Sequence, residues 1–258
     1  MHILVTAGGT SERIDSVRVI SNISTGRLGS MIADHFARVE KVLRVSFIAS
    51  KRSCLPKANN KICQYWGDTH QEVERLLEDI LKRDPPDVII HSMAISDYHV
   101  KSLFSLETLS QGMAQWLHSL STTPSAQEIE SYIQAQSTVD TSRKISSRIK
   151  HPLLLLAPNG KILQRLRDLA PNAVIVGFKL AHSKTSDELL DIAYRLLQDN
   201  RCDFVVANHV DEVTESAHKA YLLHSSKKYC IWSSKEEIAC GIVKEVLDFN
   251  NREGKQPS

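Results

Sequence analysis

Two glycines at the end of the first apolar run could bring the backbone close to a phosphate. The run HILVTA leads into TAGGT, in which Gly8 and Gly9 would let backbone N–H groups approach phosphate oxygens. A tight turn needs glycine just as much. The pair alone therefore leaves both interpretations open.

A second group with suitable chemistry follows a polar loop. Ser24, Thr25 and Gly26 stand where the N-terminus of a helix would add hydrogen-bond donors and a favourable dipole. Two phosphate-binding turns on one strand–loop–helix unit would suit a nucleoside triphosphate or two phosphorylated ligands. The spacing departs from G-x-G-x-x-G and from G-x-x-x-x-G-K-[ST], so neither the usual dinucleotide motif nor a P-loop is present. A less common nucleotide-binding arrangement is expected.

Alternating strands and helices must position these groups. Apolar or β-branched runs predict strands, and segments with a 3.6-residue period predict helices over 26–38, 70–83, 160–169 and 185–199. The expected strands are HILVTA, RVSFIAS, KICQYW, DVIIHSMAI, LLLLA, AVIVGF and DFVVAN. This alternation predicts an α/β fold, Rossmann-like and doubly wound around a mostly parallel sheet. Ligand would then bind beyond the carboxyl ends of the strands.

The end of the chain follows another pattern. KAYLLHS and KYCIWS, joined by a short polar turn, predict an antiparallel hairpin. A last helix then begins after Ser234, a suitable N-cap. We expect a single domain over residues 1–250 and a frayed tail over 251–258.

One stretch interrupts the alternation. Residues 101–143 are rich in Ser, Thr and Gln, and they carry helical patches such as GMAQWLHSL without an obvious strand. We interpret them as a flap inserted into the domain, with disorder or a dimer contact as the alternatives.

Composition excludes several classes of protein. The 258 residues are 42% hydrophobic and 24% charged, which is ordinary for a folded chain. A net charge of +2 does not predict a nucleic acid or membrane partner. Five dispersed cysteines without a C-x-x-C pair argue against a disulfide framework or a zinc site. With no signal peptide or membrane-spanning run, we expect a cytoplasmic protein.

Five ordered motifs resemble one enzyme family. They are TAGGTSERIDSVRVISNISTGRLG, HSMAISDY, RKISS, VGFKL and DFVVAN, spread over residues 3 to about 210. Together they closely resemble phosphopantothenate–cysteine ligases of coenzyme A biosynthesis, in the stand-alone bacterial form without a decarboxylase half.

This resemblance implies a two-step amide synthesis. The carboxylate of 4′-phosphopantothenate attacks the α-phosphate of CTP and releases pyrophosphate, and the amine of cysteine then displaces CMP from the acyl-cytidylate. The family uses Mg²⁺ and forms homodimers. No metal-binding motif occurs among the histidines, so we expect the Mg²⁺ to be carried by the nucleotide, with no metal-binding residue assigned.

The resemblance also assigns catalytic residues. Asn22 would hold the acyl nucleotide for attack by cysteine, Arg18 would bind phosphate or carboxylate, and Lys144 would reach the nucleotide from the far end of the flap. Without the family match, Asn22 would be interpreted as a loop residue that shapes a turn and Arg18 as a surface charge.

The remaining motifs are assigned to nucleotide binding by the same resemblance. Their residues, added to the glycine and serine turns above, are Met93, Ala94, Asp97, Phe178, Arg195 and Asn208. Asp97 could instead form a turn, and Phe178 could belong to the core. The chain departs from the family at two positions of this region, where relatives often have lysine in place of Asp199 and usually have aspartate in place of His209.

Two other functions remain open. An NADP-dependent reductase could use Lys51 and Arg52 for a 2′-phosphate, although the dinucleotide motif is missing and Tyr98 and Lys101 are three residues apart instead of four. A nucleotide-binding regulator would bind CTP without consuming it, since a fold alone does not determine function.

Overall fold

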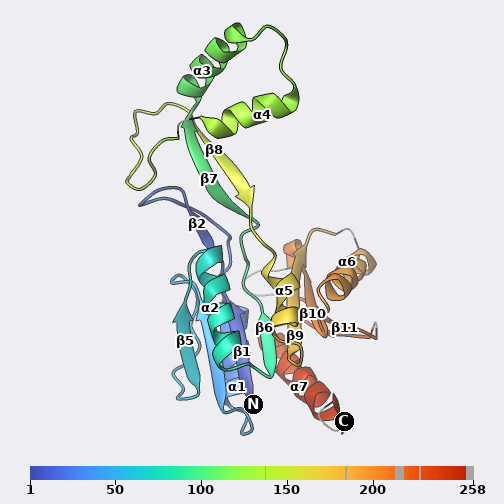
Figure 1. Ribbon diagram of the computed structural model, residues 1–258. Helices are drawn as coiled ribbons and strands as arrows, with labels where there is room; N and C mark the ends of the chain where they lie inside the picture. Colours follow the sequence, from blue (N-terminus) through green and yellow to red (C-terminus); the bar gives the residue numbers. More distant parts are fainter. Residues whose placement is uncertain (137, 184, 213–217, 227, 254–258) are drawn as a thin grey trace. The chain divides into compact units, whose positions relative to one another are not determined.

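The computed structural model describes residues 1–136, 138–183, 185–212, 218–226 and 228–253. The chain divides into two compact units, and each is discontinuous in sequence (Figure 1). The first unit contains residues 1–10, 22–95 and those from Lys161 onward, and the second contains Ser11–Ser21 and Ser96–Gly160.

A twisted eight-stranded sheet of described residues forms the centre of the first unit. Its order is β12-β11-β10-β9-β6-β1-β4-β5. The strands from β10 to β5 are parallel, and β11 and β12 form the antiparallel end. The bounds are β1 His2–Ala7, β4 Arg44–Ala49, β5 Ile62–Trp66, β6 Val88–His91, β9 Val174–Ala181, β10 Phe204–His209, β11 Ala220–His224 and β12 Tyr229–Trp232. The Rossmann-like prediction, with its C-terminal hairpin, is confirmed.

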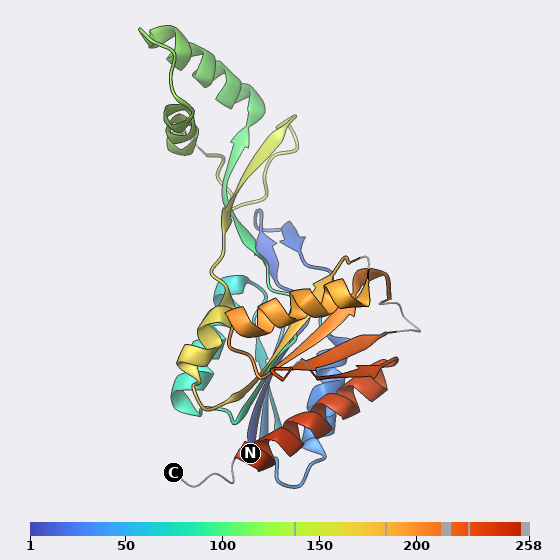
Figure 2. The same ribbon diagram turned by 90° about the vertical axis from the view of Figure 1, so that its right-hand side faces the viewer.

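Helices cover both faces of this sheet, as Figure 2 shows. One face packs against α1 (Arg27–Ala37) and α7 (Lys235–Glu253), and the other against α2 (His70–Arg83), α5 (Ile162–Leu169) and α6 (Ser186–Asp199). Neighbouring strand residues point to opposite faces, so Ile3 and Leu4 belong to different apolar clusters. This explains why central parallel strands such as β6 (VIIH) are buried on both faces and mostly apolar.

Local sequence accounts for where several helices begin. The Thr69 hydroxyl accepts a hydrogen bond from the Glu72 amide, and the Thr69 amide donates one to the Glu72 carboxylate, so the two residues cap α2. Ser234 accepts from the Glu237 amide in the same way, so the predicted N-cap of the last helix is confirmed. Helix α7 ends at Glu253, so the tail predicted to be frayed from residue 251 begins inside this helix. Residues 254–258 of that tail lie outside the described residues. A short 3-10 helix, Val210–Glu212, follows β10.

The second unit is built on two small antiparallel sheets. β2 (Ser11–Arg13) pairs with β3 (Val19–Ser21), and β7 (Tyr98–Ser105) pairs with β8 (Pro152–Pro158). Helices α3 (Leu106–Ser119) and α4 (Ala126–Ala135) lie between β7 and β8 in the chain. The rings of Trp116 and Tyr132 stack between them, with centroids 4.4 Å apart.

Two details of this unit differ from the sequence prediction. The run LLLLA, expected to alternate with helices in the main sheet, forms β8 and pairs with β7. The insertion is also wider than 101–143, because β7 and β8 extend it to 96–160 and the loop 11–21 joins the same unit. Apolar runs predict strands well, but they do not say which sheet receives the strand.

No helix among the described residues is both long enough and apolar enough to cross a membrane.

Candidate functional site

A cavity of about 600 Å³ opens at the carboxyl ends of three parallel strands in the first unit. Its wall combines the start of α1, the residues after β6, the second half of β9 and the end of β10. In an open α/β sheet this edge is where ligands bind. The lining residues are Ile23, Ser24, Thr25, Gly26, Arg27, Leu28, Gly29, Ser92, Met93, Ala94, Phe178, Lys179, Leu180, Asn208, His218 and Lys235.

Glycine at the start of α1 permits a close backbone approach. Gly26 is the N-cap, with φ of 69°, and a Cβ atom there would lie 2.7 Å from the backbone nitrogen of Gly8. Gly8 itself has φ of 93° and is buried. Neither Gly8 nor Gly9 is among the residues that line the cavity, and both are buried. Gly8 lets the α1 turn pack against the end of β1, and a Cβ atom on Gly9 would lie 2.5 Å from the Asn22 carbonyl oxygen.

The start of α1 provides groups suited to phosphate. Ser24 and Thr25 bring hydroxyls to the cavity wall, and Arg27 adds a positive charge. The amides of the first helical turn have no intrahelical partners, and Gly26 has no side chain to cap them. This helix end can therefore bind an oxyanion.

A buried histidine supports the segment after β6. Thr6 and His91 are paired across β1 and β6, with Thr6 Oγ1 and His91 Nδ1 3.0 Å apart. The Met93 amide donates to Thr6 Oγ1 at 3.3 Å. Burial lowers the pKa of His91 to about 4, so its neutral ring can accept the Thr6 proton. This chain of contacts holds Met93 beneath the cavity.

Asn22 is tied to the same segment. Its Nδ2 donates to the Ala94 carbonyl at 3.0 Å, an oxygen that also accepts from the Thr10 amide. The predicted catalytic amide thus lies beside the predicted nucleotide-binding residue Ala94. The bond also fits the alternative interpretation of Asn22 as a residue that shapes a turn.

Strands β9 and β10 form the opposite wall. Phe178 is partly buried against the cluster on the α1 side and reaches the cavity, as does Leu180, which is paired in register with Asn208. Asn208 is buried, and its Nδ2 donates to the Lys219 carbonyl at 2.9 Å. This bond ties the end of β10 to the segment that leads into β11.

The cavity is positively charged. Arg27, Lys179 and Lys235 line it, and no Asp or Glu does so among the described residues. The described part of the chain also contains no cluster of three or more His, Cys, Asp or Glu able to hold a metal ion. The site therefore suits a polyanionic ligand but supplies no carboxylate to a metal.

Four residues that line the cavity received no role from the sequence: Arg27, Lys179, His218 and Lys235. Arg27 and Lys179 lie inside the motifs STGRLG and VGFKL, whereas His218 and Lys235 come from separate elements and belong to no motif. His218 and Lys235 meet only because the β11–β12 hairpin returns the chain to the sheet.

Three predicted residues belong to the second unit. Arg18 and Lys144 are exposed, and Asp15 links the segments that carry them. The fully buried Asp15 carboxylate accepts hydrogen bonds from the Val17, Arg18 and Ile145 amides and from Arg18 Nε, at 2.8–3.1 Å. Arg18 Nη2 also donates to the Ile145 carbonyl. One edge of the Arg18 guanidinium is thus used inside the protein.

These contacts decide the charge of Asp15. Burial alone would raise its pKa, but the hydrogen bonds from Val17, Ile145 and Arg18 outweigh burial and hold the pKa well below its ordinary value. The third predicted residue of this unit, Asp97, is exposed, and its carbonyl accepts from the Asn159 amide.

The remaining predicted residues do not line the cavity. Arg195 and Asp199 are exposed on α6, and His209 forms a 2.8 Å hydrogen bond with Ser183. Lys51, considered for a 2′-phosphate, has its ammonium 3.6 Å from Asp68.

Comparison with protein families identifies one match that covers nearly the whole chain. The model of the DNA/pantothenate metabolism flavoprotein C-terminal domain matches residues 1–125 and 132–249. Among solved structures, a crystal structure of the DNA/pantothenate metabolism flavoprotein from Streptococcus pneumoniae superposes with a TM-score of 0.80 at 29% identity, covering 96% of this chain and 99% of that one.

Curated proteins of coenzyme A biosynthesis are also similar to this chain. The coenzyme A biosynthesis bifunctional protein CoaBC of Thermococcus kodakarensis is 29% identical over 80% of this chain and 40% of its own length. Its counterpart from Methanocaldococcus jannaschii is 26% identical over 95% of this chain and 50% of its own. The chain thus spans half or less of the length of these relatives. A mutant of Cab2 in complex with phosphopantothenate-cysteine shares the fold, with a TM-score of 0.67 at 19% identity over 97% of this chain and 86% of that one.

Proposed function

The chain belongs to the family of the DNA/pantothenate metabolism flavoprotein C-terminal domain, and we propose that it is a ligase that joins 4′-phosphopantothenate to L-cysteine in a CTP-dependent reaction. The observation that carries the proposal is the cavity of the first unit. A helix N-terminus and three basic side chains stand at one site with an apolar wall, and no acidic side chain lines it among the described residues. This combination suits a nucleotide or an acyl nucleotide.

The first step would form the acyl-cytidylate. A carboxylate oxygen of phosphopantothenate bonds to the α-phosphorus of CTP, and the bond to the bridging oxygen breaks to release pyrophosphate. Negative charge gathers on the phosphate oxygens, so donors placed beforehand lower the barrier. The α1 amides, Ser24, Thr25 and Arg27 are the groups of this cavity suited to that task.

The second step would form the amide. The cysteine nitrogen bonds to the acyl carbon, loses a proton, and the bond from that carbon to the phosphate oxygen breaks to release CMP. The tetrahedral intermediate carries an oxyanion, which an amide N–H can stabilise. Asn22, fixed beside Ala94, is our candidate for that contact. Arg18 and Lys144 remain predicted phosphate-binding residues from the second unit.

Magnesium would reach the site bound to the triphosphate. Mg²⁺ prefers oxygen ligands, and the described cavity lining provides no carboxylate. We therefore assign it no protein ligand.

A coupled assay tests the function. The protein is incubated with phosphopantothenate, cysteine, CTP and Mg²⁺, and pyrophosphate and CMP are measured. We expect CMP release that depends on cysteine. Its absence from a folded sample would rule out the proposal, and NADPH oxidation or CTP binding without turnover would favour the reductase or the regulator.

The variant Asn22→Asp separates the two steps. It replaces the amide donor with a carboxylate, whose negative charge would repel the Ala94 carbonyl and the developing oxyanion. We expect the variant to form phosphopantothenoyl-cytidylate but to transfer the acyl group to cysteine poorly, so that the intermediate accumulates in quenched samples analysed by mass spectrometry. A folded variant that binds CTP yet makes no cytidylate would assign Asn22 to the first step. Normal product formation would leave it a turn residue.

A further inference from the structure

His218 is a buried side chain whose polar atoms are unmatched. It is only 8% exposed, and neither Nδ1 nor Nε2 has a hydrogen-bond partner among the described residues. Its backbone is fixed, because the His218 amide donates to the Ser233 carbonyl at 3.3 Å. Burying a polar group without a partner costs free energy, so such groups in native proteins usually bind something.

The ring lines the cavity that the proposed function assigns to the nucleotide. Asn208, Lys235 and Phe178 line the same cavity. Asn208 Nδ2 holds the Lys219 carbonyl, next to His218 in the chain, so the position of the imidazole is built into the fold. A binding partner for His218 would therefore be a ligand of this cavity.

We propose that His218 binds the nucleoside part of the nucleotide directly, through the base or the sugar, by hydrogen bonds from a neutral imidazole. This inference rests on the proposed function only because that function identifies the nucleotide as CTP. A neutral imidazole has one donor and one acceptor nitrogen, which suits hydroxyl, carbonyl and amino groups.

The surroundings of His218 favour the neutral form of its ring. Burial, and secondly the positive charge of Lys235, lower the pKa of His218 below its ordinary value. A ring meant to bind phosphate would gain from being protonated, whereas this environment opposes protonation. The ring is thus better suited to uncharged polar groups.

The position of His218 relative to the sheet also indicates that it binds the nucleoside part of the ligand. The phosphate-binding groups lie at the start of α1 and after β6, while His218 precedes β11. The order β11-β10-β9-β6 places three strand spacings between them, about 14 Å at about 4.8 Å per strand. Phe178 and Leu180 on β9 lie between these ends. A nucleotide with its phosphates at α1 would extend its nucleoside past this apolar wall to His218.

The test compares ligands with and without a nucleoside. Dissociation constants of CTP, CMP and inorganic triphosphate are measured by calorimetry for wild type and His218→Phe. We expect the variant to bind CTP and CMP about 10-fold more weakly, as expected for one or two lost hydrogen bonds, and to bind triphosphate as the wild type does. The matched control is His224→Phe, at the other end of β11, which should change none of the three.

The thermal stability of the His218 variants distinguishes a ligand-binding role of this side chain from a structural one. Because His218 has no protein partner among the described residues, His218→Phe without ligand should unfold at the wild-type temperature or higher. His218→Gln and His218→Asn each retain a donor and an acceptor, near the positions of Nε2 and Nδ1 respectively. We expect one of them to recover most of the CTP affinity and so identify the nitrogen that binds.

Several outcomes would overturn the inference. They are unchanged CTP affinity in His218→Phe, an equal loss of CTP and triphosphate affinity, failure of both amide variants to recover affinity, and a wild type that binds neither CTP nor CMP. A wild type that binds CTP but releases no CMP with cysteine would reject the ligase alone, since binding is measured without the other substrates.

Discussion

At the scale of single residues, Asp15 connects two catalytic candidates. Its carboxylate joins the turn that carries Arg18 to the segment that carries Lys144, through Ile145. Asp15 could not be recognised from the sequence, because its contact with Ile145 spans 130 residues. By contrast, Ser24, Thr25 and Gly26, which the sequence assigns to phosphate binding by residue type alone, do line the cavity of the first unit, and their phosphate contact stays a prediction.

Asp15→Asn tests this connection. The amide keeps the size of the side chain but loses the charge that pairs with Arg18, and charge-assisted hydrogen bonds are about twice as strong as neutral ones. If Asp15 positions Lys144, the variant should release pyrophosphate about 10-fold more slowly, a milder form of the roughly 10²- to 10³-fold loss expected for Lys144→Gln. Combining both changes should add little to Lys144→Gln alone. Fully additive losses would show that Asp15 acts independently of Lys144.

The pH dependence of the melting temperature gives a second test of Asp15→Asn. The pKa of Asp15 is lower in the folded protein than in the unfolded chain, where it is about 3.9. Its ionised form therefore stabilises the fold above about pH 4, and this contribution is lost as the pH falls towards the folded pKa. The difference in melting temperature between wild type and Asp15→Asn should be largest at neutral pH and shrink below about pH 4. A difference that does not depend on pH would contradict this account.

At the scale of elements, strands and helices of the first unit were predictable, because each carries its own period and often its own cap. The helices predicted over 70–83 and 185–199 occur at His70–Arg83 and Ser186–Asp199. The β2–β3 hairpin was missed, since its three-residue strands are too short for a period to emerge.

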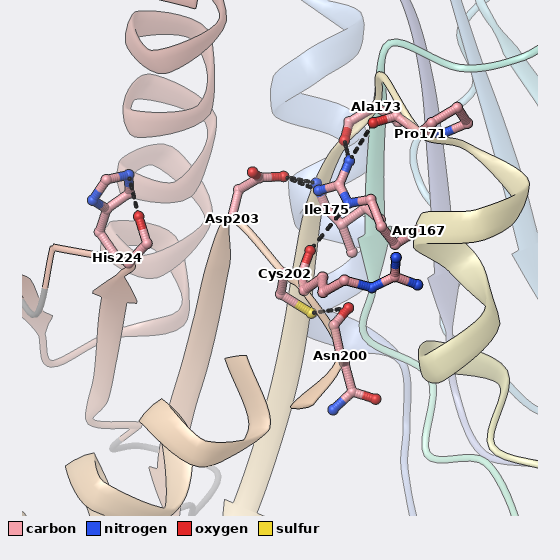
Figure 3. A network of polar contacts seen from close by, with 10 residues as sticks. Arg167, Pro171, Ala173, Ile175, Asn200, Cys202, Asp203 and His224 are labelled. Carbon is pink, nitrogen blue, oxygen red and sulfur yellow. Dashed lines mark hydrogen bonds and ion pairs between the residues drawn. The ribbon is translucent and has the colours of Figure 1, made fainter. Parts of the chain in front are cut away.

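A polar network holds α5 to the amino ends of β9 and β10, as Figure 3 shows. Arg167 donates to the carbonyls of Pro171, Ala173 and Arg201 and pairs with Asp203, which in turn accepts from the Ile175 amide. Both charged side chains are mostly buried, at 17% and 22% exposed. The network lies at the opposite edge of the sheet from the cavity, so it serves stability.

Arg167→Met should lower the free energy of unfolding by about 2–3 kcal/mol, because several carbonyls and a mostly buried carboxylate lose their donor. Turnover at saturating substrate should stay at the wild-type value. The matched control is Arg201→Met, which removes an exposed ion pair with Asp168 and should cost less than about 1 kcal/mol in urea titrations. Equal losses in the two variants would mean that burial of the Arg167 network contributes nothing extra.

At the scale of the whole molecule, the sequence predicted one domain with a flap, and the structure divides into two units. The cause is the discontinuity of the second unit, which takes Ser11–Ser21 from one part of the chain and Ser96–Gly160 from another. Local periodicity carries no information about which distant segments assemble. The five ordered motifs predicted the family nonetheless, and the family match confirms it.

The second unit presents apolar surface. On β8, Leu153, Leu154 and Leu156 are 36–42% exposed, and α3 and α4 contribute no buried residue among those described. A two-stranded ribbon is marginally stable in water by itself, and exposed apolar surface of this kind favours association. A second copy of the chain, as the family resemblance implies, would cover it.

We therefore expect a homodimer whose contact includes β8. Leu154 and Leu156 share one face of the strand, so Leu154→Lys combined with Leu156→Lys would place two charges in the contact. In sedimentation equilibrium the wild type should be dimeric at assay concentration and the double variant at least 10-fold weaker in self-association. Leu43→Lys, at an exposed leucine of the first unit, is the matched control and should remain dimeric. A fully active wild-type monomer would refute the dimer, and a dimeric double variant would move the contact away from β8.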